Sequence, residues 1–223
     1  MAIRGLLFDF DGLLVDTESP SRLAFEELYR EHGHELPRDQ WATVIGTLGA
    51  EFEPYTHLEE LVGRPLDRDA LDTWRRARED ALCELEDLRP GIVEYREEAE
   101  RLGLATAIVS SSSRRWIDKH LSRLGRTNGW DAIVTADGDP ERAKPRPILY
   151  LEALEALKLE PHEGIAFEDS PNGVRAAKAA GLACVAIPNP ATSTLALDEA
   201  DLVLESLADV SLPQLIARLD AAS

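Results

Sequence analysis

Two aspartates one residue apart, Asp9 and Asp11, are the side chains of this sequence that most clearly suggest chemistry. They end an apolar run in the segment LLFDFDGLLVDTE, Leu6–Glu18, and a glycine follows them. Residues at i and i+2 of an extended backbone point to the same side, so both carboxylates should face one space. Neighbouring carboxylates repel each other unless a cation binds them or one of them holds a proton. The pair therefore indicates a metal site or acid–base chemistry.

Three further groups of polar residues also follow apolar runs. They are the serines of SSSS, 110–113, Lys144 in AKP, and the acidic pair Glu168 and Asp169 in EDS. Four carboxylates in one place favour a hard divalent cation, and Mg²⁺ is the usual one because it accepts carboxylates, waters and substrate phosphate. Lys144 would supply a second positive charge. Together these residue types suit a Mg²⁺ site for an anionic small molecule.

Short apolar segments alternate along the chain with segments of helical length. The expected strands are Ile3–Phe10, Leu104–Ser110, Asp131–Ala136, Gly164–Asp169, Ala183–Ile187 and Leu202–Leu204, and the expected helices are Gly91–Leu102, Ser113–Leu124, Ile148–Leu157 and Asn172–Ala180. Apolar runs without strict alternation indicate strands buried on both faces, as in a parallel sheet. This order predicts an α/β, doubly wound, Rossmann-like fold whose ligands bind beyond the carboxyl ends of the strands. All four polar groups lie at such ends and can converge on one crevice.

The first two expected strands are separated by far more chain than one crossover helix needs. About ninety residues lie between Asp11 and Leu104. The segment from Asp16 to Glu86 is rich in Glu, Arg, Leu and Ala and has little strand character. It therefore predicts an inserted helical domain over residues 16–86, with residues 1–15 and 87–223 forming the α/β core domain.

Composition bounds the function further. The chain has 223 residues, of which 44% are hydrophobic and 30% charged, and its formal net charge is -18. Such a charge argues against nucleic acid and against an anionic membrane as partners, so a small molecule is the expected ligand. The two cysteines predict free thiols in a reducing compartment, and the sequence shows neither a signal peptide nor an apolar run of the ~20 residues that span a membrane. We expect a cytoplasmic protein, and no feature of the sequence indicates its oligomeric state.

Each polar group also has a structural interpretation when it is taken alone. DFDG could end a strand in an Asx turn, Lys144 could be a solvated surface residue, and EDS could be an acidic helix N-terminus. For Ser112 and Ser113, capping of the helix that begins there is the preferred interpretation. All four structural interpretations would have to coincide at consecutive strand ends, which favours a functional site.

These motifs resemble those of the haloacid dehalogenase superfamily, in its phosphatase and β-phosphoglucomutase-like branch. DFDGLLVDTE is similar to the first motif of that family, Ser110 after AIVS to the second, Lys144 in KP to the third, and EDSPNG to the fourth. The resemblance covers essentially the whole chain. It identifies the inserted helical segment with the cap domain of the family.

The resemblance implies a role for each site residue. Asp9 would be the nucleophile that forms an aspartyl-phosphate, and Asp11 the general acid and base. Ser110, Ser111 and Lys144 would hold phosphate oxygens. The metal set would be Asp9, Asp11 (through its backbone carbonyl), Glu168 (directly or through water) and Asp169, with Mg²⁺ as cofactor. The implied substrate is a small phosphorylated metabolite, plausibly a sugar or polyol phosphate.

Three functions remain open at this stage, namely a phosphatase, a β-phosphoglucomutase-like mutase and a non-catalytic binding module. The mutase pattern has a histidine where Ser21 stands and an arginine near the position of Gly49, and it uses a cap lysine, whereas this chain has no lysine before Lys119. These departures favour hydrolysis. A non-catalytic module has little support for a different reason, which is that every expected catalytic position of the family is filled.

Substrate specificity is expected in the cap domain. Its candidate residues are Thr47, Phe52, Arg75 and Arg76. Trp41, Trp74 and Trp116 are expected in the core of the protein, because a tryptophan packs against apolar neighbours more often than it contacts a ligand.

Overall fold

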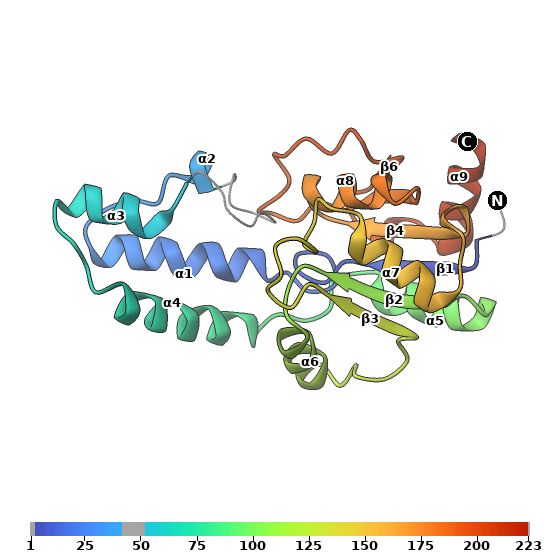
Figure 1. Cartoon of the computed structure of the whole chain (residues 1–223), viewed down its shortest axis with the longest axis horizontal. Helices are drawn as coiled ribbons and strands as arrows, with labels where there is room; N and C mark the ends of the chain where they lie inside the picture. The colour runs from blue at the N-terminus through green and yellow to red at the C-terminus, as the bar shows by residue number, and fades with distance from the viewer. Residues whose placement is uncertain (1–2, 42–51, 223) are drawn as a thin grey trace.

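The computed structural model describes residues 3–41 and 52–222. Within them, six parallel strands form one sheet in the order β3-β2-β1-β4-β5-β6 (Figure 1). The strands are β1 (Gly5–Phe8), β2 (Ala105–Ser110), β3 (Ala132–Thr135), β4 (Gly164–Glu168), β5 (Ala183–Ala186) and β6 (Leu202–Val203). The central strand β1 is buried along its whole length between β2 and β4. Its unbroken apolar sequence fits this place, since both of its faces are covered.

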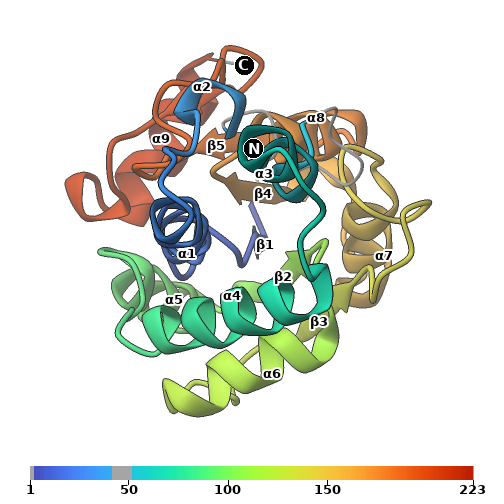
Figure 2. The same ribbon diagram turned by 90° about the vertical axis from the view of Figure 1, so that its left-hand side faces the viewer.

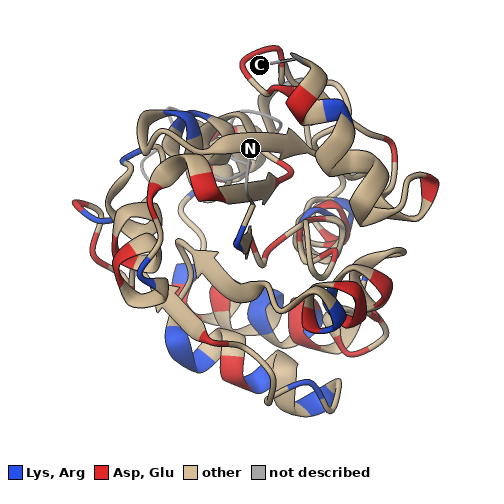
Figure 3. Cartoon of the chain, turned by 90° about the vertical axis from the view of Figure 1, so that its right-hand side faces the viewer, with Lys and Arg blue, Asp and Glu red and all other residues tan. Residues whose placement is uncertain are grey.

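Helices cover both faces of the sheet. Helices α5 (Ile92–Leu102), α6 (Arg114–Arg123) and α9 (Leu212–Ala222) pack on the face that carries Phe8 and Phe167, whereas α7 (Ile148–Leu157) and α8 (Pro171–Ala179) pack on the face that carries Leu7 and Ala166. Two short 3-10 turns, η1 (Pro161–Glu163) and η2 (Leu207–Asp209), complete the core domain. Figure 3 shows acidic and basic residues interspersed along the helices and few charges on the strands.

The described residues between β1 and α5 are largely helical and project from the carboxyl ends of the strands (Figures 1 and 2). This segment contains α1 (Glu18–Glu31), α2 (Arg38–Trp41), α3 (Pro54–Val62) and α4 (Arg68–Cys83), and α1 packs against α4. Its apolar centre is separate from that of the sheet and includes Phe25, Leu28 and Tyr29 of α1. We call this segment the cap.

The two chain segments that connect the cap to the core domain run side by side. Val15 and Leu88 form an antiparallel bridge, and the Arg89 N–H donates to Leu14 O at 2.9 Å. The Arg89 guanidinium also donates to the backbone carbonyls of Gly12, Ile187 and Pro188 at 2.6, 3.0 and 2.8 Å. Both connections are therefore anchored to the loop that follows β1.

The structure confirms the predicted α/β fold with its helical insertion. The strands agree with the predicted segments within one or two residues at most ends, and the four expected helices of the core domain are present. Helix α9 was not predicted. In the described ranges, no helix combines the length and the apolar character that a membrane span requires. The domain boundaries at residues 15/16 and 86/87 stay a prediction.

Candidate active site

The carboxyl ends of neighbouring strands bring the predicted site residues together. Asp9 directly follows β1, Ser110 ends β2, and Glu168 ends β4. Lys144 reaches the same place from the segment between β3 and α7. Asp9, Lys144 and Glu168 are 6%, 7% and 0% exposed, so these charged groups are buried where only partners of opposite charge can compensate them.

Lys144 is the cation at the centre of this cluster. Its Nζ donates to Asp9 Oδ1, to Glu168 Oε1 at 2.6 Å and to the backbone carbonyl of Val109 at 2.8 Å. Burial by itself would lower the pKa of Lys144, but the charges of Asp9 and Glu168 outweigh it and raise the pKa. Lys144 is therefore held in its charged form.

One ammonium group does not balance the three carboxylates around it. Burial raises the pKa of Asp9 well above its ordinary value, the charges of Glu168 and Asp11 add to this effect, and Lys144 opposes it. Burial also raises the pKa of Asp169, and Asp9 and Glu168 raise it further. With all three carboxylates ionised, the site would carry an excess of negative charge that a second cation could neutralise.

The arrangement of these carboxylates fits a hard metal ion. Asp9, Glu168 and Asp169 each place one oxygen within 4.8 Å of the others. Glu168 Oε1 accepts from Lys144 and from the Tyr150 hydroxyl at 2.6 Å, whereas its Oε2 is buried and has no hydrogen-bond partner among the described residues. Gly173 leaves the space for this carboxylate, because a Cβ at its position would lie 1.8 Å from Oε2. An all-oxygen donor set with an unpartnered buried oxygen suits Mg²⁺.

Asp11 lies beside this cluster, and its carboxylate accepts four hydrogen bonds from residues in the described ranges. Oδ1 accepts from the Thr17 hydroxyl at 2.9 Å and from the indole Nε1–H of Trp116 at 2.7 Å. Oδ2 accepts from the hydroxyls of Ser110 at 3.2 Å and Ser112 at 2.6 Å. The carboxylate is thus held in one orientation by groups from β2, from the loop after it, from α6 and from the start of the cap.

The four serines after β2 have separate roles. The Ser111 hydroxyl accepts from the backbone N–H of Lys144 at 3.1 Å, which ties the two loops together. Ser113 caps α6 by accepting from the Trp116 N–H. The prediction that Ser112 serves the helix cap is wrong, because its hydroxyl donates to Asp11 instead. Ser113, which directly precedes α6, is the N-cap residue of this helix, and the Ser112 hydroxyl faces Asp11 instead.

Asp169 is oriented by the loop that follows β5. Asn189 is 2% exposed, and its Nδ2 donates to Asp169 Oδ2 at 2.7 Å and to Gly12 O at 3.3 Å. Gly12 has a positive φ of 85°, and a Cβ there would lie 2.3 Å from Asp169 Oδ2. A glycine is therefore required where the loop after β1 passes the Asp169 carboxylate.

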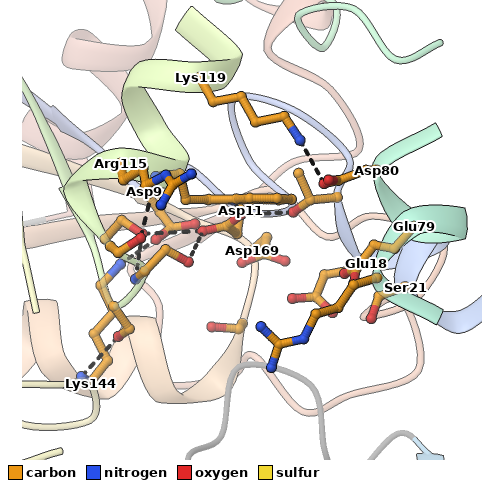
Figure 4. A pocket seen from close by; sticks show the side chains of 18 of the residues that line it. Asp9, Asp11, Glu18, Ser21, Glu79, Asp80, Arg115, Lys119, Lys144 and Asp169 are labelled. Atoms are coloured by element: carbon orange, nitrogen blue, oxygen red, sulfur yellow. Dashed lines mark hydrogen bonds and ion pairs between the residues drawn. The ribbon is translucent and has the colours of Figure 1, made fainter. Parts of the chain in front are cut away.

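A cavity of about 630 Å³ opens between this cluster and the cap (Figure 4). From the cap it is lined by Glu18, Ser21, Trp41, Arg75, Arg76, Glu79 and Asp80. Burial, followed by the charges of Asp11, Glu79 and Asp16, raises the pKa of Glu18 to about 8. Lys119 of α6 pairs with Asp80 of α4 at 2.6 Å and so joins the core domain to the cap at the edge of the cavity.

The predicted specificity residues lie in different parts of the structure. Arg75 and Arg76 line the cavity, and Arg75 is tied to Glu79 and to Asp72. Phe52 is partly buried and packs against the apolar centre of the cap. Thr47 and Gly49 lie outside the described residues.

Sequence reasoning missed three residues at the site, namely Tyr150, Asn189 and Trp116. Asn189 follows the fifth strand, so the strand-end argument that found the other groups could have found it. Tyr150 is the one hydroxyl-bearing residue of the apolar helix α7, and a buried tyrosine hydroxyl needs a partner. The prediction of Trp116 as a core residue is incomplete, since its ring packs against the core but its Nε1 faces Asp11.

Comparison with known sequences gives one consistent result. The family description "Haloacid dehalogenase-like hydrolase" matches residues 6–187. The chain is 43% identical over 219 residues to "Putative phosphatase YhcW" of Bacillus subtilis (strain 168), covering 98% of this chain and 99% of that protein. It is 30% identical to Hexitol phosphatase A of Escherichia coli (strain K12), covering 95% of this chain and 94% of that protein.

A solved structure with a bound sugar phosphate is also similar. A mutant of CbbY from Rhodobacter sphaeroides in complex with xylulose-(1,5)bisphosphate superposes with a TM-score of 0.73. It is 30% identical to this chain, covering 96% of this chain and 99% of that one. The similarity therefore extends over both the α/β core and the cap.

Proposed function

The chain belongs to the haloacid dehalogenase-like hydrolase family as a phosphoric monoester hydrolase, and we propose that it releases phosphate from a small sugar or polyol phosphate through an aspartyl-phosphate at Asp9. The observation that carries this proposal is the buried cluster of Asp9, Glu168 and Asp169 around Lys144. A transferring phosphoryl group carries negative charge on three oxygens, so it needs a nucleophile surrounded by cations. Lys144 supplies one such cation at the nucleophile.

The carboxylates also support the proposed cofactor. Asp9, Glu168, Asp169 and the backbone carbonyl of Asp11 would hold Mg²⁺. When bound, Mg²⁺ would neutralise charge on the phosphate oxygens and on the carboxylates themselves.

The chain's own residues would carry both steps of the reaction. In the first step a carboxylate oxygen of Asp9 attacks phosphorus, the bond from phosphorus to the leaving oxygen breaks, and protonated Asp11 gives its proton to that oxygen. In the second step Asp11 takes a proton from water, the water oxygen attacks the phosphorus of aspartyl-phosphate, and inorganic phosphate leaves with Asp9 restored. Ser110, Ser111 and Lys144 would hold the phosphate oxygens throughout.

The cavity supports a polar organic group on the substrate. Its cap side presents carboxyl, hydroxyl and guanidinium groups, among them Glu18, Ser21 and Arg75. These groups form hydrogen bonds with the hydroxyls of a sugar or polyol. Hexitol phosphatase A and the xylulose-(1,5)bisphosphate complex of CbbY support the same substrate class.

The test is phosphate release from a panel of hexitol, pentose and hexose phosphates, with Mg²⁺ and with EDTA. We expect turnover only with Mg²⁺, and a phosphoryl adduct on Asp9 in acid-quenched protein. Asp9→Asn should lose both while keeping its circular dichroism spectrum, because an amide does not attack phosphorus. Asp118→Asn, on the exposed surface of α6, is the matched control and should keep both. Activity of Asp9→Asn near the wild-type level would refute the assignment of the nucleophile.

The mutase alternative is separated by a second assay. Glucose 1-phosphate is incubated with enzyme and Mg²⁺, with and without a bisphosphate primer. We expect free phosphate without any need for the primer, because the described part of the cap contains no lysine to hold a second phosphate. Efficient, primer-dependent formation of glucose 6-phosphate with little free phosphate would favour the mutase.

A further inference from the structure

Trp116 contacts the proposed general acid from α6. Its Nε1–H donates to Asp11 Oδ1 at 2.7 Å, and its ring also lines the cavity. No motif of the sequence predicts this contact. Of the four hydrogen bonds that described residues donate to the Asp11 carboxylate, it is the only one that comes from a nitrogen.

The indole differs chemically from the other three donors to Asp11. The hydroxyls of Thr17, Ser110 and Ser112 can rotate and can donate or accept, whereas an indole N–H can only donate. Asp11 Oδ1 therefore has to remain an acceptor as long as Trp116 faces it. When Asp11 is protonated, its proton is directed to Oδ2, on the side of Ser110 and Ser112.

The indole ring is fixed well enough to impose this choice. It lies in the first turn of α6, whose capping serine accepts from the Trp116 backbone N–H. Its ring contacts that of His120 edge to face, with centroids 4.2 Å apart, and Lys119 Nζ lies 5.5 Å from the ring centroid. His120 is 1% exposed, so the ring rests against a buried neighbour.

We propose that Trp116 is a positioning residue of the phosphatase: its indole N–H keeps Oδ1 of Asp11 an acceptor, so that Oδ2 delivers the proton to the leaving oxygen and later takes one from water. This inference rests on the proposed function. Without the indole N–H, the proton can reside on either oxygen of Asp11 and the carboxyl group can turn, so the productive arrangement becomes a minority.

The test uses Trp116→Phe, which keeps an aromatic ring and removes the N–H. Its kcat/KM is measured for p-nitrophenyl, phenyl and ethyl phosphate, because this ratio reports the steps up to phosphorylation of Asp9. p-Nitrophenolate leaves without a proton, whereas ethanol needs one. We expect little change for p-nitrophenyl phosphate and a loss of about tenfold to a hundredfold for ethyl phosphate, the effect of one hydrogen bond to a charged group. This stays below the 10²–10⁴-fold typical of a whole general acid.

Trp116→His restores the donor, because Nε2 of histidine overlies Nε1 of tryptophan when the two five-membered rings are superposed. At pH 8, where the imidazole is neutral, this variant should recover most of the activity on ethyl phosphate. Trp116→His also keeps the inference testable if Trp116→Phe does not fold. If Trp116→His lost activity on ethyl phosphate but kept its activity on the other two esters, the inference would be contradicted. Trp130→Phe is the matched control, because it removes an indole N–H bonded to the Arg126 carbonyl away from the site. It should change none of the three ratios.

A double variant separates positioning from packing. In an Asp11→Asn background, the further change Trp116→Phe should have no additional effect, because the two residues act as one unit. An equal loss for all three esters, or no loss for ethyl phosphate, would overturn the inference while leaving the proposed function intact. If the wild type hydrolyses no ester at all, the proposed function fails, and the inference fails with it.

Discussion

Replacement of Lys144 by methionine tests the electrostatic balance of the site. Methionine resembles the lysine stem in length but carries no charge, so Asp9, Glu168 and Asp169 would remain buried without a cation. Removing one partner of a buried ion pair costs about 3–5 kcal/mol. For a chain of this size each kcal/mol lowers Tm by about 2–4 °C, which predicts a decrease of roughly 6–20 °C.

Lys119→Met provides a control of matched chemistry. Lys119 forms an ion pair with Asp80 that is as long as the pair of Lys144 with Glu168, 2.6 Å, but Lys119 and Asp80 are 40% and 45% exposed. An exposed pair contributes at most about 1 kcal/mol, so Tm should fall by no more than about 4 °C. Because the two ion pairs have the same N–O distance, a difference in Tm between the two variants reports the effect of burial.

The assay is thermal unfolding followed by circular dichroism, in EDTA at pH 8 and pH 5, and then with Mg²⁺. The deficit of Lys144→Met should be largest at pH 8 and smaller at pH 5, because burial raises the pKa values of Asp9 and Asp169 and both can then take up protons. Mg²⁺ should restore part of the stability by binding the same carboxylates. A decrease in Tm no larger than that of Lys119→Met would refute the view that Lys144 stabilises the cluster.

Two further predictions concern other carboxylates of the cavity. Mg²⁺ should raise the Tm of the wild type, and Asp169→Ala should abolish most of that rise; an unchanged response would place the ion elsewhere. Glu18→Gln should be more stable than the wild type at pH 9 by about 1–2 kcal/mol and equal to it at pH 4, as measured by urea unfolding in EDTA. The sign follows because the folded chain keeps the Glu18 proton up to about pH 8, whereas the unfolded chain releases it near pH 4.5, so wild-type stability falls between these values. Linkage would allow up to about 5 kcal/mol, and water at the cavity reduces it; an identical pH profile for both proteins would contradict the raised pKa.

Most of the site residues that the sequence predicts lie at the carboxyl end of a strand or directly after it, whereas Lys144 lies further along the segment between β3 and α7. Asp9, Ser110 and Glu168 could be found because apolar runs mark the strands and the parallel sheet aligns their ends. Tyr150 and Trp116 could not be found in this way, since they reach the site from helices whose rotation about their own axes depends on packing. The sequence predicts that such helices exist. Which side of each helix faces the site is determined by how the helices pack on the two faces of the sheet.

Helix α9 shows the same limit for the fold. Leu212, Leu215 and Leu219 are buried on the sheet and have helical spacing. The other core helices were expected because each connects two strands of the sheet. Helix α9 follows the last strand and connects to no further one, so this argument did not predict it. The proposed cap boundaries rest on composition alone, whereas the backbone pairs the two connections at Val15 and Leu88.

The strand order also determines when the protein can fold during synthesis. The central strand β1 is made first, but it pairs with β2 from Gly5 to Ala105 and with β4 from Gly5 to Gly164. On the ribosome, β1 must therefore wait with open edges until most of the chain has been translated. The cap, whose helices α1 to α4 contact one another within one continuous segment, has no such delay. A nascent chain would thus carry a formed cap before any active site exists, and a chain that stops before β4 would leave an apolar, unpaired strand edge that promotes aggregation.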